Sequence, residues 1–125
     1  MIVEERCYPL KPGTVPLYYK DYDPRGLQIQ TRILGRLIGY FHTEIGELNQ
    51  VVHLWGYESL AERERRRALL AADPEWQEYL KNSPDIVVKM VSRILVPAPF
   101  SPIKYCRRTV MRFAQFTIRP EVVSS

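Results

Sequence analysis

A predicted β-hairpin in the middle of the chain constrains the fold more than any other sequence feature. Residues 36–43 and 49–57 are rich in β-forming residues, and Gly46 between them suits a turn. A loop of two or of four residues gives the same register, with Tyr40 opposite His53 and Ile38 opposite Trp55. Because side chains alternate along a strand, this register assigns every hairpin residue to one of two faces.

The segment before the hairpin predicts a strand followed by a helix. Residues 2–10 alternate as a strand does, and Thr14 is a suitable N-cap for a helix whose apolar side continues to about residue 34. Pro24 and Gly26 interrupt that pattern. We therefore expect one broken helical segment.

The segment after the hairpin predicts a second helical unit and a last strand. Ser59 and Glu62 form a capping box that starts a helix. Asp73 and Pro74 repeat the start signal for another helical piece, which ends before Pro84. Residues 86–96 are rich in β-branched side chains and predict a fourth strand.

The order of these elements predicts an α+β fold of the ferredoxin-like β-α-β-β-α-β type. Right-handed crossovers place both helical units on one face of a four-stranded antiparallel sheet and leave the other face bare. Residues 1–97 are expected to form this domain, and residues 98–125 a Pro-containing tail that is poorly ordered. The tail holds the whole formal net charge of +4, but its basic residues are spread out, which favours a solubilising role over nucleic-acid binding.

The hairpin register also predicts what the bare face contains. Gly39 and Gly56 would let a helix approach closely, so their side of the hairpin, together with Cys7, is expected beneath the helices. The bare face then gathers large aromatic residues, namely Tyr8, Tyr40, Trp55 and Tyr57. Monomers rarely expose such a patch, so we expect a second copy of the chain to cover it in a homodimer.

A candidate small-molecule site lies among the same residues. The candidate ligand-binding residues are His53, Tyr40, Trp55, Arg6, Tyr8 and Arg93. An acid/base role suits a histidine, and an arginine suits an anionic group. Plain interface packing is the competing interpretation. No catalytic constellation stands out, so the catalytic residues, and whether the protein is an enzyme, stay open.

Several partners and cofactors are not expected. Cys7, Cys106, His42 and His53 lack the spacing of a zinc site, and no glycine-rich phosphate loop opens a helix, so neither metal nor cofactor is expected. The arginine-rich run at residues 63–67 alternates with glutamates, which favours a solvated helix face over a nucleic-acid site. No apolar run reaches the ~20 residues of a membrane span, and the first residues resemble neither a signal nor a transit peptide. We therefore expect a cytoplasmic protein.

The hairpin region closely resembles the NIPSNAP family. The resemblance rests on residues 35–59, GRLIGYFHTEIGELNQVVHLWGYES, followed by LAER, and extends over roughly residues 1–102. It implies a ferredoxin-like dimeric α/β barrel and little about chemistry. The leading hypothesis is a homodimer whose sheets enclose a small-molecule pocket. The alternatives are a cofactor-independent, monooxygenase-like enzyme acting on a small organic molecule and a noncatalytic protein-interaction module.

Overall fold

Four antiparallel strands form the sheet in the computed structural model, which describes residues 1–104. In chain order the strands are β1 (Ile2–Pro9), β2 (Arg36–His42), β3 (Gln50–Tyr57) and β4 (Val91–Leu95). Their order across the sheet is β2-β3-β1-β4, and each neighbouring pair is antiparallel. This confirms the predicted ferredoxin-like topology. Most of the predicted tail, residues 105–125, lies outside the described residues.

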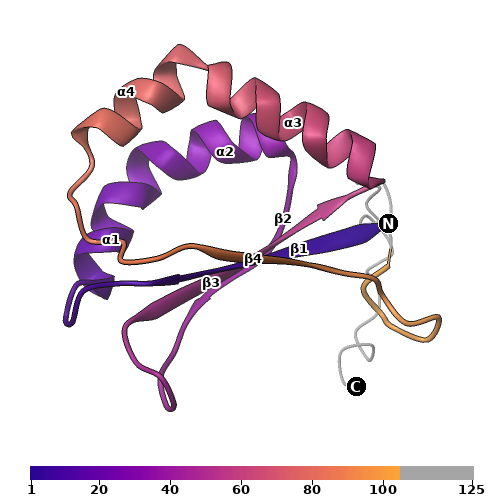
Figure 1. The fold of residues 1–125 in the computed structure, drawn as a ribbon, viewed down its shortest axis with the longest axis horizontal. Coiled ribbons are helices and arrows are strands. Elements are labelled where there is room, and N and C mark those ends of the chain that lie inside the picture. The colour runs from indigo at the N-terminus through magenta and orange to yellow at the C-terminus, as the bar shows by residue number, and fades with distance from the viewer. Residues whose placement is uncertain (105–125) are drawn as a thin grey trace.

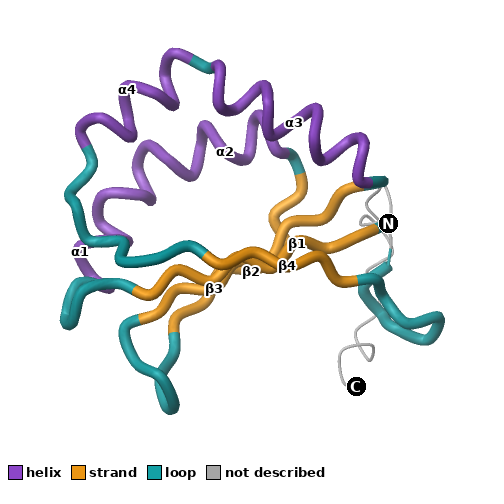
Figure 2. The backbone as a smooth tube through the Cα atoms, in the orientation of Figure 1, coloured by secondary structure: helices purple, strands orange, loops and turns teal. Residues whose placement is uncertain are grey.

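All the described helices lie on one side of this sheet (Figures 1 and 2). The first unit runs through α1 (Val15–Asp21), a π-helical turn η1 (Tyr22–Gly26) and α2 (Leu27–Leu34). The second unit consists of α3 (Leu60–Ala72) and α4 (Pro74–Asn82). The other side of the sheet carries no described helix, as the crossover rule predicts.

The starts of α3 and α4 form where the sequence predicts them. The Ser59 side chain accepts a hydrogen bond from the Glu62 amide at 3.1 Å, and the Asp73 side chain accepts one from the Glu75 amide at 3.3 Å. Each side chain satisfies an amide that the helix itself leaves unpaired. Thr14 is the N-cap residue of α1, as predicted, but its side chain forms no capping hydrogen bond, because its hydroxyl donates to the Lys11 carbonyl at 2.6 Å.

The predicted break at Pro24 and Gly26 is a change of helix type rather than a gap. The Leu27 amide donates to the Tyr22 carbonyl, five residues back, so the chain passes from α1 to α2 through a π-helical turn. A π-turn accommodates a proline that lacks an amide and would clash in a regular α-helix. Tyr22 and Gly26 in this turn are both buried.

The hairpin register is correct at its centre and shifts near its open end. Tyr40 pairs with His53 as predicted, but an irregularity between Leu37 and Gly39 brings Leu37, not Ile38, opposite Trp55. An extra residue in one strand of a ladder moves every residue beyond it to the other face.

The assignment of the two sheet faces is the main error of the sequence prediction. Trp55 is fully buried and Tyr57 is 2% exposed, in a core cluster with Leu34 of α2 and Leu70 of α3. Tyr8 and Tyr40 also pack beneath the helices, so all four aromatic residues predicted for the bare face lie on the covered face. The helix layer rests on large aromatic rings rather than on glycines.

The prediction that Gly39 lets a helix approach the sheet is wrong, because Gly39 makes room for a side chain of its own strand. A Cβ atom added to Gly39 would lie 2.7 Å from the Phe41 ring, two residues along the same strand and on the same face. The missing side chain therefore makes room for a phenylalanine ring, and no helix is involved.

We call the uncovered side of the sheet the open face. By register it carries Val3, Glu5, Cys7, Arg36, Gly39, Phe41, Val52, Leu54, Val91, Arg93 and Leu95. Cys7, predicted beneath the helices, lies here as a free thiol. The face is mainly apolar, with an ion pair between Arg93 and Glu5. Phe41 is 53% exposed and Val91 42% exposed.

The last strand is shorter than predicted. It spans Val91–Leu95 instead of residues 86–96, and ahead of it only Val87 forms an isolated bridge, to Leu10. On this stretch Ile86 is buried, but Val88 and Met90 are 65% and 60% exposed and have little to pack against. β-branched composition alone therefore overestimates the strand.

Candidate functional site

The structure brings five of the six predicted site residues together, but beneath the helices. Arg6 and Tyr8 come from β1, Tyr40 from β2, and His53 and Trp55 from β3, all on the covered face. His53 lies at the centre of this group, because it pairs with Arg6 of β1 on one side and with Tyr40 of β2 on the other. The sixth residue, Arg93, lies on the open face and is not part of the group.

His53 is enclosed by aromatic rings. His53 is 1% exposed, and its ring stacks on Tyr40 with centroids 4.4 Å apart and meets Tyr8 edge-on at 4.9 Å. Trp55 Nε1 donates a hydrogen bond to His53 Nδ1 at 2.7 Å. A neutral imidazole that accepts at Nδ1 carries its proton at Nε2, and Nε2 has no hydrogen-bond partner.

Burial holds this histidine in its neutral form. Desolvation, followed by the charges of Arg6 and Arg67, lowers the pKa of His53 to about 3. At neutral pH the ring is uncharged and only weakly basic. The predicted role as an acid or base is thus poorly supported, whereas the free Nε2–H group is a good hydrogen-bond donor.

Two tyrosines from the first helical unit complete the aromatic layer. The Tyr18 and Tyr40 hydroxyls are hydrogen-bonded at 2.5 Å, and the Tyr22 hydroxyl donates to Gln30 at 2.6 Å. Burial raises the pKa of all three tyrosines, so they stay protonated. The contact of Tyr18 and Tyr22 with Tyr40 was not predicted, because Tyr40 was assigned to the bare face from the sequence.

A buried carboxylate next to this layer was not predicted. Glu4 is completely buried and accepts hydrogen bonds from Arg63 at 2.9 and 3.0 Å, from Arg6 at 2.8 Å and from Ser92 at 2.5 Å. Burial raises its pKa, but these hydrogen bonds outweigh burial and hold the pKa at about 2. In the sequence, Glu4 lies between Ile2 and Arg6 on the same side of the first strand. That position predicts a buried carboxylate only once that side of the strand is known to be covered by helices.

A small cavity opens beside the aromatic layer. Its volume is about 100 Å³, and its walls include the rings of Tyr8, Tyr18, Tyr22, Trp76 and Tyr79. We call it the tyrosine cavity. Tyr8 belongs to both the cavity wall and the group around His53. The cavity volume is smaller than the about 150 Å³ of an apolar cavity that accommodates benzene, so the cavity holds a few water molecules as it stands and takes an aromatic ring only if its wall side chains shift.

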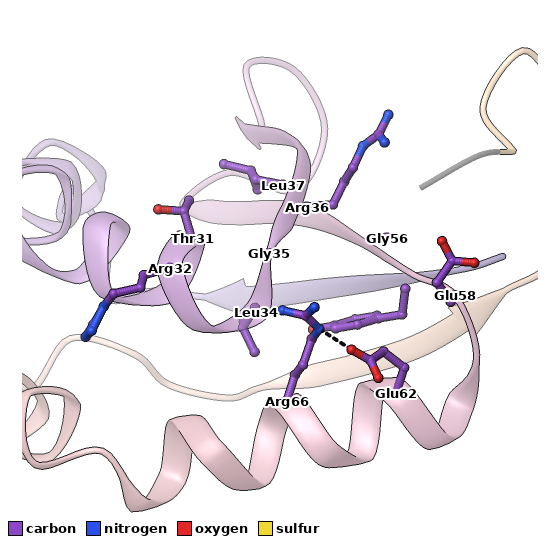
Figure 3. Close-up of a pocket in the computed structure, with 11 residues that line it drawn as sticks. Thr31, Arg32, Leu34, Gly35, Arg36, Leu37, Gly56, Glu58, Glu62 and Arg66 are labelled. Carbon is purple, nitrogen blue, oxygen red and sulfur yellow. Dashed lines mark hydrogen bonds and ion pairs between the residues drawn. The ribbon is translucent and has the colours of Figure 1, made fainter. Parts of the chain in front are cut away.

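A larger groove lies at the other end of the helix layer (Figure 3). It has a volume of about 660 Å³ and lies between the end of α2, the start of β2 and the start of α3. Two of its arginines form ion pairs: Arg66 donates to Glu62 at 2.6 Å (Figure 3), and Arg32 contacts Asp73 at 3.1 Å. With these two arginines already paired, this groove is the weaker candidate for a specific polar site.

Within residues 1–104, no group of three His, Cys, Asp or Glu side chains is arranged to hold a metal ion. None of the helices in this part of the chain is long and apolar enough to cross a membrane.

Sequence comparisons connect the chain with one family. The NIPSNAP family model matches residues 3–102. The chain is 33% identical over 103 residues to mouse Protein NipSnap homolog 2, covering 82% of this chain and 36% of that protein. It is also 33% identical over 104 residues to human Protein NipSnap homolog 3B, covering 82% of this chain and 42% of that protein. The chain thus spans less than half the length of these relatives.

Structural comparisons agree. An uncharacterized NIPSNAP-like domain protein from Burkholderia xenovorans has 52% identity and a TM-score of 0.80, covering 84% of this chain and 91% of that one. A putative antibiotic biosynthesis monooxygenase from Bacteroides thetaiotaomicron has only 15% identity and a TM-score of 0.51, covering 85% and 95%. The second similarity concerns the fold alone.

Proposed function

This chain belongs to the NIPSNAP family, and within that fold we propose that it binds a small, mainly apolar organic molecule in the tyrosine cavity. The observation that carries the proposal is Tyr8, which links the cavity to the enclosed group around His53. Ligand pockets are commonly apolar and aromatic with a few polar groups, and here Gln30 and Ser83 supply polar atoms in the wall.

In this proposal the predicted site residues take different roles. Tyr8 contacts the ligand directly. Tyr40, His53 and Trp55 are positioning residues, because His53 packs against the Tyr8 ring while Tyr40 and Trp55 hold His53 in place. Arg6 fixes the Tyr8 hydroxyl with a hydrogen bond of 2.8 Å. Arg93 takes no part, since it lies on the open face.

A titration with phenol tests the proposal in the full-length protein. The chain has two tryptophans, so the indole N–H signals in an NMR spectrum report separately on Trp76 in the cavity wall and Trp55 beside His53. Phenol is expected to shift the Trp76 signal in a saturable manner. Ile86 lines the cavity, and Ile86→Phe should weaken binding by about tenfold or more, equivalent to about 1.4 kcal/mol.

Val88→Phe is the matched control, because Val88 is 65% exposed two residues away and does not line the cavity. It should bind phenol as the wild type does. The proposal is wrong if phenol fails to shift Trp76, or if Ile86→Phe and Val88→Phe bind equally well. Catalysis on the bound molecule, the enzyme alternative, draws support only from the fold.

We also propose that the protein is a homodimer joined through the open face. This face is a mainly apolar sheet surface with exposed Phe41 and Val91, which a soluble monomer rarely leaves uncovered. The face also carries an ion pair between Arg93 and Glu5. Such a pair is self-complementary, because across a two-fold axis the Arg93 of each copy could pair with the Glu5 of the other. A noncatalytic interaction module, in which another protein covers this face, is the second candidate.

The remaining expectations stay predictions. A cytoplasmic location suits the free thiol of Cys7. The lack of a nucleic-acid partner suits an α3 surface on which Arg65 and Arg66 both pair with Glu62.

A further inference from the structure

Polar side chains in the wall of the tyrosine cavity already have partners within the protein. The pairs are Tyr18 with Tyr40, Tyr22 with Gln30 and Asp21 with Arg25. A polar group placed in the cavity would exchange its hydrogen bonds to water for contacts with groups that are already paired, which is unfavourable. A ligand in the cavity therefore gains mainly from contact between its carbon atoms and the wall.

The size of the cavity favours a chain over a ring. Its volume is about 100 Å³, below the about 150 Å³ that accommodates benzene. A water molecule takes up about 30 Å³ in the liquid, and a methylene group is of similar size, so the cavity holds about three such groups. An alkyl chain can insert only as many groups as there is room for, whereas a ring must insert all its atoms together. The end of an alkyl chain therefore fits without displacing the wall.

The exposed residues of the wall show where the cavity meets solvent. Leu80 near the end of α4 is 52% exposed and Met90 just before β4 is 60% exposed, whereas Tyr8, Tyr22 and Tyr79 are buried. The two exposed residues lie at either end of the connection that leads from α4 to β4 (Figures 1 and 2). We call this side of the cavity its mouth. A molecule that enters here meets apolar side chains first and can keep its other end in water.

We propose that the ligand of the tyrosine cavity is an amphiphile with a straight alkyl chain, whose hydrocarbon end fills the cavity and whose polar end stays in water at the mouth formed by Leu80 and Met90. This inference rests on the proposed function and names the chemical class of the ligand. Each methylene that moves from water to an apolar wall strengthens binding, whereas a methylene at the mouth stays half exposed and contributes less. The affinity of a homologous series should therefore change slope at the chain length that fills the cavity.

A titration of the full-length protein with straight-chain 1-alkanols tests the inference, with the indole N–H signal of Trp76 in the cavity wall as the readout. Up to about 1-butanol, the dissociation constant should fall about fourfold for each added methylene. Beyond that length it should fall by less than about twofold for each methylene, because the added groups lie at the mouth. A constant fourfold fall up to 1-octanol would overturn the inference, since affinity would then follow hydrophobicity alone.

Cyclohexanol and phenol test the preference for a chain, because they have the same number of carbon atoms as 1-hexanol. After correction for the partition of each compound between octanol and water, 1-hexanol should bind about tenfold more tightly than either ring. Equal or tighter binding of a ring would overturn the inference but leave the proposed function intact. If neither the alkanols nor phenol shift the Trp76 signal, both proposals are wrong.

Variants of the wall and of the mouth locate the bound chain. Ile86 is buried in the wall, so Ile86→Phe reduces the space and should move the change of slope to a shorter alkanol. Met90→Ala removes part of the mouth and should weaken binding of 1-hexanol by about twofold while leaving that of 1-propanol unchanged.

Val88→Ala is the matched control for Met90→Ala, because Val88 is 65% exposed, lies two residues away and does not line the cavity. It should reproduce the wild-type series. A change of slope that stays in place in Ile86→Phe, or a Met90→Ala variant that binds 1-hexanol as the wild type does, would contradict the proposed position of the chain. The wild-type series itself does not depend on the folding of any variant.

Discussion

His53 shows how strongly position determines the chemistry of a single residue. Its ring lies between Tyr40 and Tyr8, accepts a hydrogen bond from Trp55 and stays neutral because burial opposes its charge. The same residue on an exposed strand would titrate near pH 6.5. In the fold, His53 therefore acts as a rigid, uncharged packing residue whose Nε2–H group is available as a hydrogen-bond donor.

This environment predicts that acid weakens the fold through His53. The pKa of His53 is about 3 in the folded protein and about 6.5 when unfolded, so between these values the unfolded chain binds the additional proton. Stability from this residue is complete above pH 6.5 and is lost as pH falls toward 3. Between pH 6.5 and 4.5 the loss should reach about 2–3 kcal/mol.

Urea unfolding measured across that pH range checks this prediction. His53→Gln keeps an acceptor for Trp55 but cannot titrate, so its free energy of unfolding should stay level from pH 6.5 to 4.5. A variant that loses stability as steeply as the wild type would show that another group is responsible.

Glu4 predicts a second, more acidic window. Its pKa of about 2 lies below the ordinary 4.5, so its stabilisation is present above pH 4.5 and is lost as pH falls toward 2. Glu4→Gln leaves Arg63 and Arg6 without their carboxylate and should cost about 2–4 kcal/mol at neutral pH.

Glu5→Gln is the matched control for Glu4, because Glu5 is the adjacent residue and pairs with the exposed Arg93 on the other face. Its cost in urea unfolding should stay below about 1 kcal/mol. Equal costs for the two variants would mean that Glu4 gains nothing from its buried cluster.

At the scale of elements, the π-turn η1 links the fold to the cavity. It presents Tyr22 to the cavity wall and packs Gly26 against Tyr79, another wall residue. A Cβ atom at Gly26 would lie 2.7 Å from both rings. The glycine is thus required for close packing between the two helical units, not for an unusual backbone angle.

Gly26→Ala should therefore destabilise the protein, although alanine normally stabilises a helix relative to glycine. We expect a loss of about 1–3 kcal/mol in urea unfolding, because the Tyr22 and Tyr79 rings must shift. Gln28→Ala, at an exposed site in the following helix, should change stability by less than about 0.5 kcal/mol. A neutral or stabilising Gly26→Ala would contradict the observed packing.

The elements also show what could be predicted from sequence. Strong local signals, such as the Ser59 and Asp73 caps and the pairing of Tyr40 with His53, were sufficient for element order and topology. The face assignment needed information that local patterns lack. Gly39 fitted either a helix or the Phe41 ring, and nothing in the sequence marked the irregularity after Leu37.

The same error explains the mixed outcome for the site. Arg6, Tyr8, Tyr40, His53 and Trp55 were grouped correctly, because alternation keeps residues on one face together whichever face it is. Their surroundings were wrong: helices cover them, not a second sheet. Glu4 and Tyr18 could be recognised only after that correction.

At the scale of the whole molecule, the two faces of the sheet have different roles. The covered face holds the aromatic layer, the Glu4 cluster and the tyrosine cavity. The open face is mainly apolar and lacks a described helix. The central claim of our account is that this face joins two copies of the chain, while each copy keeps its own ligand site.

Two exposed residues on the open face allow the proposed dimer contact to be tested without changing the ligand site on the covered face. Phe41 on β2 and Val91 on β4 are 53% and 42% exposed in the single chain. The double variant Phe41→Asp/Val91→Asp should place like charges across the proposed interface without disturbing the covered face. Leu60→Asp/Leu69→Asp is the matched control, because these leucines are 54% and 51% exposed on α3.

Light scattering coupled to size-exclusion chromatography at micromolar concentration measures the outcome. The wild type and the α3 control should have twice the chain mass of 14.7 kDa, whereas the open-face variant should have that mass itself. A wild-type particle of 14.7 kDa, or an open-face variant that remains a dimer, would contradict the account.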